Sequence, residues 1–441
     1  MIYTVIDSEN IKNPFMEKQL LKEIIYDQRE QLKAKKEGVK REALHGLLKR
    51  FAVLPHAIVI AGIRRSGKST LLCQIMNALD AKGYYFNFED ERLIHFEVAD
   101  FQKLYEALAE LEGERRIFFF DEIQNVGGWE RFVRRMHDQG YKFFLTGSNA
   151  SLLSRELGTK LTGRHISITL YPFSFAEYLR FHDYQWRKDD LYSTKRRVEL
   201  KRYFDRYLQE GGMPEYLQYR TKESLKKVYD DILYRDIIVR YDLKESKSLR
   251  ELSLYFISNI AAPFSYNKLK NFLQLGSVNT VKSYLEYLEN SFLFFSISRF
   301  SHSLKQQSVS PKKIYCIDNG LAQNIAFAFS ENKGKFLENL VFLELQRRRK
   351  EVYYYKTKDG FEVDFAIKEG REIKKLIQVA WSLEKADVKE RELRALSAAM
   401  KELRVNKSLI LTDDYEETVR FEKKTIKALP VYKWLMEGAG G

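Results

Sequence analysis

The chain has little cysteine and no hydrophobic run long enough to cross a bilayer. Its two cysteines, Cys73 and Cys316, stand far apart, which excludes a disulfide framework and a cysteine-based metal cluster. The apolar runs at 58–63 and 291–297 are far shorter than the roughly 18 residues that a membrane helix needs. No N-terminal signal peptide is evident. We therefore expect a cytoplasmic protein with no membrane partner.

Disorder is also excluded, because 44% of the 441 residues are hydrophobic. This length suggests two or three domains, each large enough to bury its own core. The net charge of +14 favours anionic partners such as nucleic acid or an acidic protein. Solvated lysine faces are the commoner source of such a charge, so composition alone does not identify the partner.

A strong local motif follows the apolar run at 58–63. Gly62 and Gly67 frame a loop of P-loop spacing, in which glycines let backbone N–H groups point at phosphates. Lys68 would reach the β- and γ-phosphates, and the Ser69 hydroxyl would bind Mg²⁺. The expected nucleotide-contacting residues of this loop are Gly62, Arg65, Ser66, Gly67, Lys68, Ser69 and Thr70.

Two further strands end in polar residues that suit nucleotide hydrolysis. The apolar run 117–120 leads into Asp121 and Glu122, a Walker B pattern in which the first carboxylate holds Mg²⁺ and the second acts as general base. The run 142–145 ends at a polar tip, where Asn149 is the expected γ-phosphate sensor. Its neighbours Ser148 and Thr146 are alternatives, and turn formation is the plain structural reading.

An arginine usually balances the charge that develops during phosphoryl transfer. Arg164 is our first candidate for this role and Arg155 the second, although either could be an ordinary surface arginine. The sequence does not distinguish an arginine acting within the chain from one acting across a subunit interface. An oligomer therefore stays open.

The motifs together resemble the AAA+-superfamily ATPases of bacteria and archaea. The likeness rests on the segments 61–70, 120–126, 145–149, 171–179 and 211–216. It implies ATP as the nucleotide, and a lid that begins at the Gly-Gly-x-Pro element, with Gly212 and Pro214 near the nucleotide. It also implies a winged helix and a restriction-endonuclease-like C-terminal domain.

We therefore expect an α/β protein with a parallel P-loop sheet. The expected domains are a helical arm at 1–50, the ATPase core at 51–170, a helical lid at 171–245, a winged helix at 246–310 and a nuclease-like domain at 311–441. In the lid, Asp236 and Arg240 stand four residues apart and are expected to form a structural ion pair. The winged helix would present residues 279–288 to DNA, or serve only as a packing module.

The C-terminal third resembles the PD-(D/E)XK nuclease fold. Glu338 and Asp364 match its first two metal ligands, but Gln378 and Ala380 stand where an acidic residue and a lysine belong. A neutral amide is a poor replacement for a carboxylate at Mg²⁺. We therefore expect a vestigial metal site formed by Glu338, Asp364 and Gln378, unless Lys356 or Lys385 supplies the missing lysine.

Three functions follow as expectations. The first is an ATPase that couples nucleotide state to movement of the winged-helix and nuclease-like module, with DNA as a candidate partner. The second is a nucleotide-gated switch that captures a protein partner without acting on DNA. The third is an ATP-gated, metal-dependent nuclease.

Overall fold

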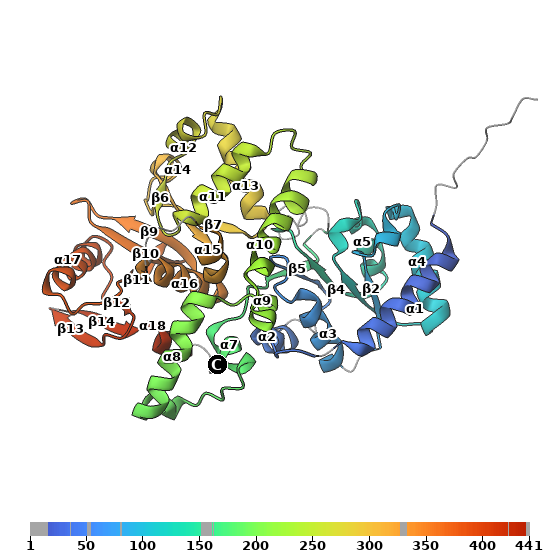
Figure 1. The fold of residues 1–441 in the computed structure, drawn as a ribbon, viewed down its shortest axis with the longest axis horizontal. Coiled ribbons are helices and arrows are strands. Elements are labelled where there is room, and N and C mark those ends of the chain that lie inside the picture. Colours follow the sequence, from blue (N-terminus) through green and yellow to red (C-terminus); the bar gives the residue numbers. More distant parts are fainter. Residues whose placement is uncertain are drawn as a thin grey trace, which may run out of the picture. The chain divides into compact units, whose positions relative to one another are not determined.

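The computed structural model describes residues 16–437, except 36, 51–53, 80–81, 151–160, 162, 327–332 and 422. Contacts within the chain divide it into two units (Figure 1). The first unit comprises residues 1–61, 68–147 and 151–168, and the second comprises 62–67, 148–150 and 169–441. The loop that joins the first strand to its helix, residues 62–67, thus groups with the second unit.

The first unit is built on a five-stranded sheet. Its strands are β1 (Ala57–Ala61), β2 (Tyr84–Asn87), β3 (Ile117–Asp121), β4 (Lys142–Gly147) and β5 (His165–Thr169). They lie in the order β2-β3-β4-β1-β5, and β1, β2, β3 and β4 pair in parallel. Burial of β1 along its whole length explains its unbroken apolar sequence. The strands expected in the apolar runs 58–63, 117–120 and 142–145 are confirmed, and so is the parallel arrangement of β1 to β4.

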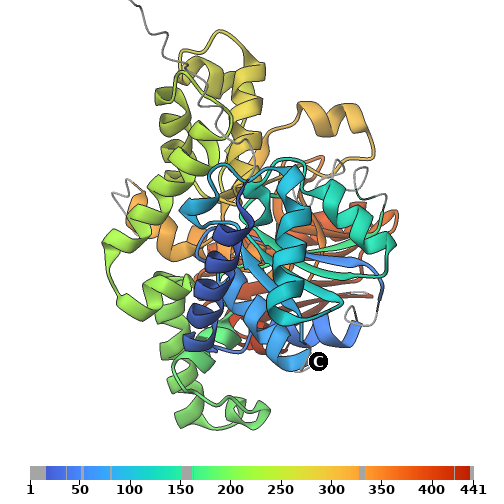
Figure 2. The same ribbon diagram turned by 90° about the vertical axis from the view of Figure 1, so that its right-hand side faces the viewer.

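Helices surround this sheet (Figure 2). They are α1 (Lys18–Ala34), α2 (Glu42–Arg50), α3 (Lys68–Leu79), α4 (Phe101–Glu112) and α5 (Glu130–Asp138), with the short 3-10 helices η1 (Glu91–Leu93), η2 (Val98–Asp100) and η3 (Ile123–Asn125). Helix α1 buries Leu21, Ile24 and Ile25. Gln28 of the same helix donates a hydrogen bond to the carbonyl of Asn87 at 2.9 Å. The expected helical arm therefore corresponds to α1 and α2, which pack on the core.

The second unit begins with helices. They are α7 (Phe175–Phe181), η5 (Lys188–Leu191), α8 (Thr194–Glu210), α9 (Pro214–Tyr219), α10 (Lys222–Asp231) and the π-helix η6 (Ile232–Val239). Ser174 caps α7 in a reciprocal box with Glu177, and Pro214 occupies the first turn of α9, where its missing N–H costs nothing. The expected helical character of residues 171–245 is therefore seen directly.

A small antiparallel sheet follows. The elements are α11 (Lys247–Ser258), β6 (Pro263–Phe264), α12 (Tyr266–Phe272), α13 (Val278–Asn290), β7 (Phe294–Ile297), α14 (Leu304–Val309), β8 (Lys312–Cys316) and α15 (Asn319–Ile325). Strand β8 lies between β6 and β7. The boundary expected at residue 310 therefore falls too early, because the last strand of this sheet comes after it.

The C-terminal part contains a mixed six-stranded sheet. Its elements are α16 (Lys333–Arg347), β9 (Glu351–Lys356), β10 (Glu362–Glu369), β11 (Glu372–Val379), α17 (Ala386–Glu402), β12 (Lys407–Thr412), β13 (Glu417–Phe421), β14 (Lys424–Pro430) and α18 (Val431–Glu437). The strand order is β13-β14-β12-β11-β10-β9. Among the described helices of the whole chain, none is long and apolar enough to span a bilayer.

Candidate functional site

The P-loop connects the end of β1 to the start of α3. A Cβ atom on Gly62 would lie 2.2 Å from the carbonyl oxygen of Leu170, so no larger residue fits there. Arg65 and Gly67 adopt φ angles of 64° and 90°. Alternation of left-handed and right-handed residues turns successive N–H groups toward one point, which makes an anion-binding nest. The loop therefore has the backbone shape that a phosphate group requires.

Asp121 ends β3 and lies beside the first turn of α3. Its carboxylate accepts hydrogen bonds from the hydroxyls of Thr146 and Ser69. Burial raises the pKa of Asp121 and the neighbouring Glu122 charge raises it further, while the two hydroxyls act in the opposite direction. A serine hydroxyl in contact with a carboxylate fits the oxygen ligands that Mg²⁺ takes from a protein when a nucleotide supplies the others.

Glu122 lies between two side chains of the first unit. Its Oε1 is 3.2 Å from Nζ of Lys68, and its Oε2 accepts a hydrogen bond from Gln124 at 2.6 Å. The Lys68 side chain is only 4% exposed and that of Glu122 12%. The P-loop lysine and both Walker B carboxylates therefore meet at the carboxyl edge of the sheet.

Thr146, at the end of β4, links the two carboxylate residues. Its Oγ1 accepts the Glu122 N–H at 3.0 Å and donates to the Asp121 carboxylate. Ser148 and Asn149 are also buried, but they group with the second unit. Among the sensor candidates, Thr146 thus contacts both Walker B residues, and a sensor role for Asn149 stays a prediction.

The arginines of the P-loop contact helices of the second unit. The Arg64 guanidinium donates from Nε and Nη2 to the Asp236 carboxylate of η6, at 3.2 and 3.0 Å. Arg65 lies 3.2 Å from Glu215 of α9. The expected pairing of Asp236 with Arg240 is therefore wrong, because a partner 172 residues away in sequence takes the carboxylate.

A buried aspartate, Asp318, accepts a hydrogen bond from the Gly-Gly-x-Pro element. Gly212 donates its N–H to Asp318 at 2.6 Å, and Leu321 donates to the other oxygen of the same carboxylate at 2.9 Å. Burial raises the pKa of Asp318 to about 6, although these N–H groups partly oppose the shift. Pro214 then begins α9, whose Glu215 reaches Arg65. Pro214 therefore lies one residue from a P-loop contact, and its role at the nucleotide stays a prediction.

Arg164 lies at the amino-terminal end of β1, opposite the end at which the P-loop begins. Its carbonyl accepts the N–H of Ala57, the first residue of β1, whereas Lys68 follows the last. At roughly 3.3 Å per residue, a five-residue strand separates these edges by about 16 Å. The Arg164 guanidinium instead pairs with exposed Asp138. Arg164 does not face the Walker B carboxylates of its own chain, so a role toward a neighbouring copy stays a prediction. Arg155 lies outside the described residues.

The three residues expected to form a vestigial metal site do lie together. Asp364 donates its backbone N–H to Gln378 Oε1 at 3.2 Å. Nζ of Lys313 stands 2.9 Å from Asp364 Oδ1 and 3.1 Å from Glu338 Oε1. The lysine at this cluster is thus neither Lys356 nor Lys385. Among the described residues, no group of three histidine, cysteine or acidic side chains is placed to hold a metal. A vestigial metal site at Glu338, Asp364 and Gln378 stays a prediction.

Sequence reasoning missed Lys313, Asp318 and the partner of Arg64. A signal for Lys313 existed, because Lys313 and Tyr315 occupy alternate positions of β8 and so lie on the same face of the strand, where both are buried. Neither Asp318 nor Asp236 carries a local pattern that names its partner.

Comparison with protein families agrees with this geometry. Residues 55–179 match a profile described as "AAA domain". Residues 201–332 and 333–434 match two profiles described as domains of unknown function, DUF8612 and DUF4143. The division at 332/333 lies after β8 and supports the later boundary.

Similar solved structures include the Walker-type ATPase PABY2304 of Pyrococcus abyssi. It is 17% identical, with a TM-score of 0.41, and the match covers 65% of this chain and 95% of that one. The Aeropyrum pernix ORC1 protein in complex with DNA is 14% identical, with a TM-score of 0.28 and coverage of 64% and 90%. Both TM-scores lie below 0.5, so neither likeness supports an argument about function.

Two relatives match over nearly their whole length. MJ1544 of Methanocaldococcus jannaschii, named as an uncharacterized protein, is 37% identical over 403 residues, which cover 87% of this chain and 89% of that protein. An uncharacterized protein of Haemophilus influenzae is 32% identical over 396 residues, covering 86% and 94%. The chain therefore belongs to the same family as these two relatives, and its residues 55–179 match the AAA domain.

Proposed function

We propose that this protein binds ATP with Mg²⁺ at the P-loop, hydrolyses it, and passes the nucleotide state to its second unit. The observation that carries the proposal is the meeting of Lys68, Ser69, Asp121 and Glu122 at one edge of the sheet. A cradle without carboxylates would bind nucleotide only. A carboxylate held beside the P-loop lysine supplies the base that hydrolysis needs.

The chemistry uses residues already in contact. Mg²⁺ held by Ser69 and Asp121 would neutralise phosphate charge. When nucleotide binds, the Lys68 ammonium would leave Glu122 and pair with the β- and γ-phosphates, because a nucleotide carries a larger negative charge than one carboxylate. Glu122 can then accept a proton from a water molecule while the water oxygen attacks the γ-phosphorus. The bond between the γ-phosphorus and the bridging oxygen of ADP breaks.

The link to the second unit would run through Arg64 and Arg65. Both belong to the loop that closes around phosphate, and they pair with Asp236 of η6 and Glu215 of α9. A π-helix such as η6 often marks a functional position, because its hydrogen bonding is less regular than that of an α-helix. Loop closure would therefore shift the two helices.

Duplex DNA is our proposed second ligand. The order of α11, β6, α12, α13, β7 and β8 supports the winged-helix interpretation, with α13 as the reading helix. Asn279 and Lys282 are exposed on its first turns. The ammonium groups of Lys282 and Lys312 lie 5.6 and 5.8 Å from the ring centre of Tyr266. Two lysines on one aromatic ring form a small cationic face that suits a phosphate backbone.

Steady-state ATP hydrolysis, with and without duplex DNA, tests both parts. Lys68→Ala should show no turnover, and Glu122→Gln should bind ATP yet hydrolyse it roughly 10²–10⁴-fold more slowly. DNA stimulation that is lost in Lys282→Ala and at high salt would support DNA as the ligand. A rate of ATP hydrolysis that is the same with and without DNA would favour the protein-interaction switch. A Glu122→Gln variant that hydrolyses ATP at the wild-type rate would show that Glu122 is not the general base.

A mixing experiment tests Arg164 across a subunit interface. Lys68→Ala and Arg164→Ala should each be inactive alone, and a mixture of the two should regain activity if one copy supplies Arg164 to the other's site. A mixture as inactive as its components would leave Arg164 as the surface partner of Asp138.

A further inference from the structure

A buried ammonium group on β8 lies among acidic side chains of α16 and β10. Nζ of Lys313 lies 3.1 Å from Glu338 Oε1, 2.9 Å from Glu362 Oε1 and 2.9 Å from Asp364 Oδ1. The Lys313 side chain is only 3% exposed. An uncompensated ammonium at such depth would be strongly destabilising, so these carboxylates are what permits the lysine to be there.

Two acids of the cluster have hydrogen-bond partners besides Lys313. Asp364 Oδ2 accepts the N–H of Val379 at 2.9 Å, and Glu338 Oε1 also accepts the hydroxyl of Tyr315 at 2.8 Å. Gln378 turns its amide oxygen to the backbone N–H of Asp364. Glu338 and Asp364 are thus held in place by the ammonium together with a tyrosine hydroxyl and a backbone N–H.

The spacing also differs from that of a metal site. Mg²⁺ requires oxygen atoms at about 2.0–2.1 Å and Ca²⁺ at about 2.3–2.6 Å, whereas the oxygens here stand about 3 Å from the central atom. A divalent ion added beside Lys313 would meet like charge at contact distance. The lysine therefore stands where a cation would have to be.

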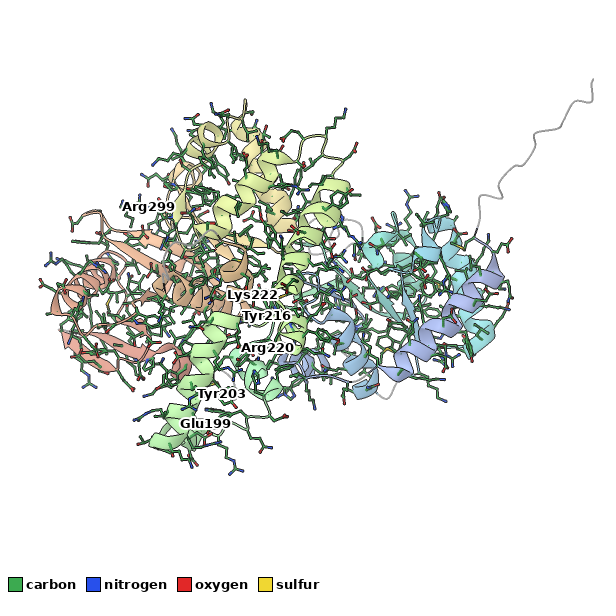
Figure 3. The ribbon with its side chains drawn as sticks, in the orientation of Figure 1. Glu199, Tyr203, Tyr216, Arg220, Lys222 and Arg299 are labelled. Carbon is green, nitrogen blue, oxygen red and sulfur yellow. The ribbon has the colours of Figure 1, made fainter. Side chains whose placement is uncertain are left out.

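The lysine and the acids come from different parts of the sequence. Lys313 belongs to β8 of the three-stranded sheet, while the acids belong to α16 and β10. Other hydrogen bonds join the segment after β7 to β9: the Phe300 N–H donates to the carbonyl of Tyr354 at 2.7 Å, and the guanidinium of Arg299, labelled in Figure 3, donates to the carbonyl of Lys356 at 2.9 Å. The ion cluster is therefore one of several contacts between the three-stranded sheet and the six-stranded sheet.

We propose that Lys313 is a built-in cation that replaces a divalent metal between Glu338 and Asp364. This site belongs to the chain itself and takes no external metal. The C-terminal domain accordingly performs no metal-dependent phosphodiester cleavage, and its acidic residues serve to fasten it to β8. The inference does not depend on ATP hydrolysis at the P-loop.

Thermal unfolding of the full chain tests the charge balance. Lys313→Met should lower the melting temperature by roughly 5–10 °C, because it leaves buried carboxylates without their counter-ion. Adding Glu338→Gln and Asp364→Asn to it should recover most of that loss, since the cluster is then largely neutral. Lys312→Met is the matched control, because that ammonium lies over Tyr266 instead, and it should change little. Absence of recovery in the triple variant would overturn the proposal.

Metal addition tests the replacement directly. Mn²⁺ should leave the melting temperature of the nucleotide-free wild type unchanged, and should raise that of Lys313→Ala, whose vacated position can admit the ion. Adding Asp364→Asn to the Lys313→Ala variant should abolish the increase in melting temperature that Mn²⁺ causes. A Mn²⁺ shift in the wild type that Asp364→Asn removes would overturn the proposal, as would a Lys313→Ala variant that no divalent ion stabilises. If Lys313→Ala does not fold, the triple variant above decides alone.

Discussion

Removal of the Asp236 carboxylate should weaken ATP binding even though this residue contacts only a P-loop arginine. Two charge-assisted hydrogen bonds join Asp236 to Arg64, at 3.2 and 3.0 Å. The Asp236 side chain is 4% exposed and that of Arg64 19%. Breaking a fully buried pair costs about 3–5 kcal/mol, and the partial exposure of Arg64 reduces this to about 2–3 kcal/mol.

Part of that free energy should appear as lost loop order. If about half of it holds the P-loop in its phosphate-binding shape, Asp236→Ala raises the Kd for ATP by roughly tenfold, since 1.4 kcal/mol is a factor of ten. Titration with a fluorescent ATP analogue measures this change. A double-mutant cycle with Arg64→Ala should give a coupling energy of about 2 kcal/mol in the binding and unfolding data together.

Asp231→Ala provides the control. Asp231 is the last residue of α10 and pairs at 3.5 Å with Arg235, which is 64% exposed, so this ion pair should contribute less than about 1 kcal/mol. An Asp236→Ala protein that melts at a lower temperature but binds ATP as tightly as Asp231→Ala would refute the reasoning. The pair would then be structural only.

Three further changes test other contacts. Thr146→Val removes the hydroxyl that joins Asp121 to the Glu122 N–H, so kcat should fall roughly 10–100-fold while KM for ATP changes little; an unchanged kcat would contradict this positioning role. Gly62→Ala should abolish nucleotide binding, because its Cβ would collide with the Leu170 carbonyl, whereas Gly46→Ala in α2, with open space around it, should bind normally in the same titration. The pKa of Asp318 is about 6 in the folded protein, which is above its value in the unfolded chain. The protonated carboxyl group therefore stabilises the fold fully below about pH 4, and this stabilisation is lost as the pH rises through 6. The free energy of unfolding of the wild type relative to Asp318→Asn should therefore increase by up to about 3 kcal/mol from pH 7 to pH 4, and a pH-independent difference would exclude the shift.

The sequence predicted the first unit well because its strands are short apolar runs that end in chemical motifs. Spacing alone identified the P-loop and Walker B residues, and the structure places Nζ of Lys68 3.2 Å from Oε1 of Glu122. The sequence could not predict the direction in which Arg164 faces. That direction depends on whether the Arg164 segment pairs with the first or the last residue of β1.

Elsewhere the pattern was weaker. Strands β13 and β14 were not predicted, since residues 417–421 alternate charged and apolar side chains at an edge of the sheet. Long-range ion pairs such as Arg64 with Asp236 leave no local trace in the sequence.

The position of Lys313 has a practical consequence for dividing the chain. The family profiles meet between residues 332 and 333, which suggests a natural place to cut. A fragment that begins at residue 333 would keep Glu338 and Asp364 but lose their counter-ion, and the complementary fragment would keep a lysine that has lost its acids. Each half would then carry buried charge of one sign, so expressing the halves separately should yield two insoluble products, whereas producing them together should let each restore the other.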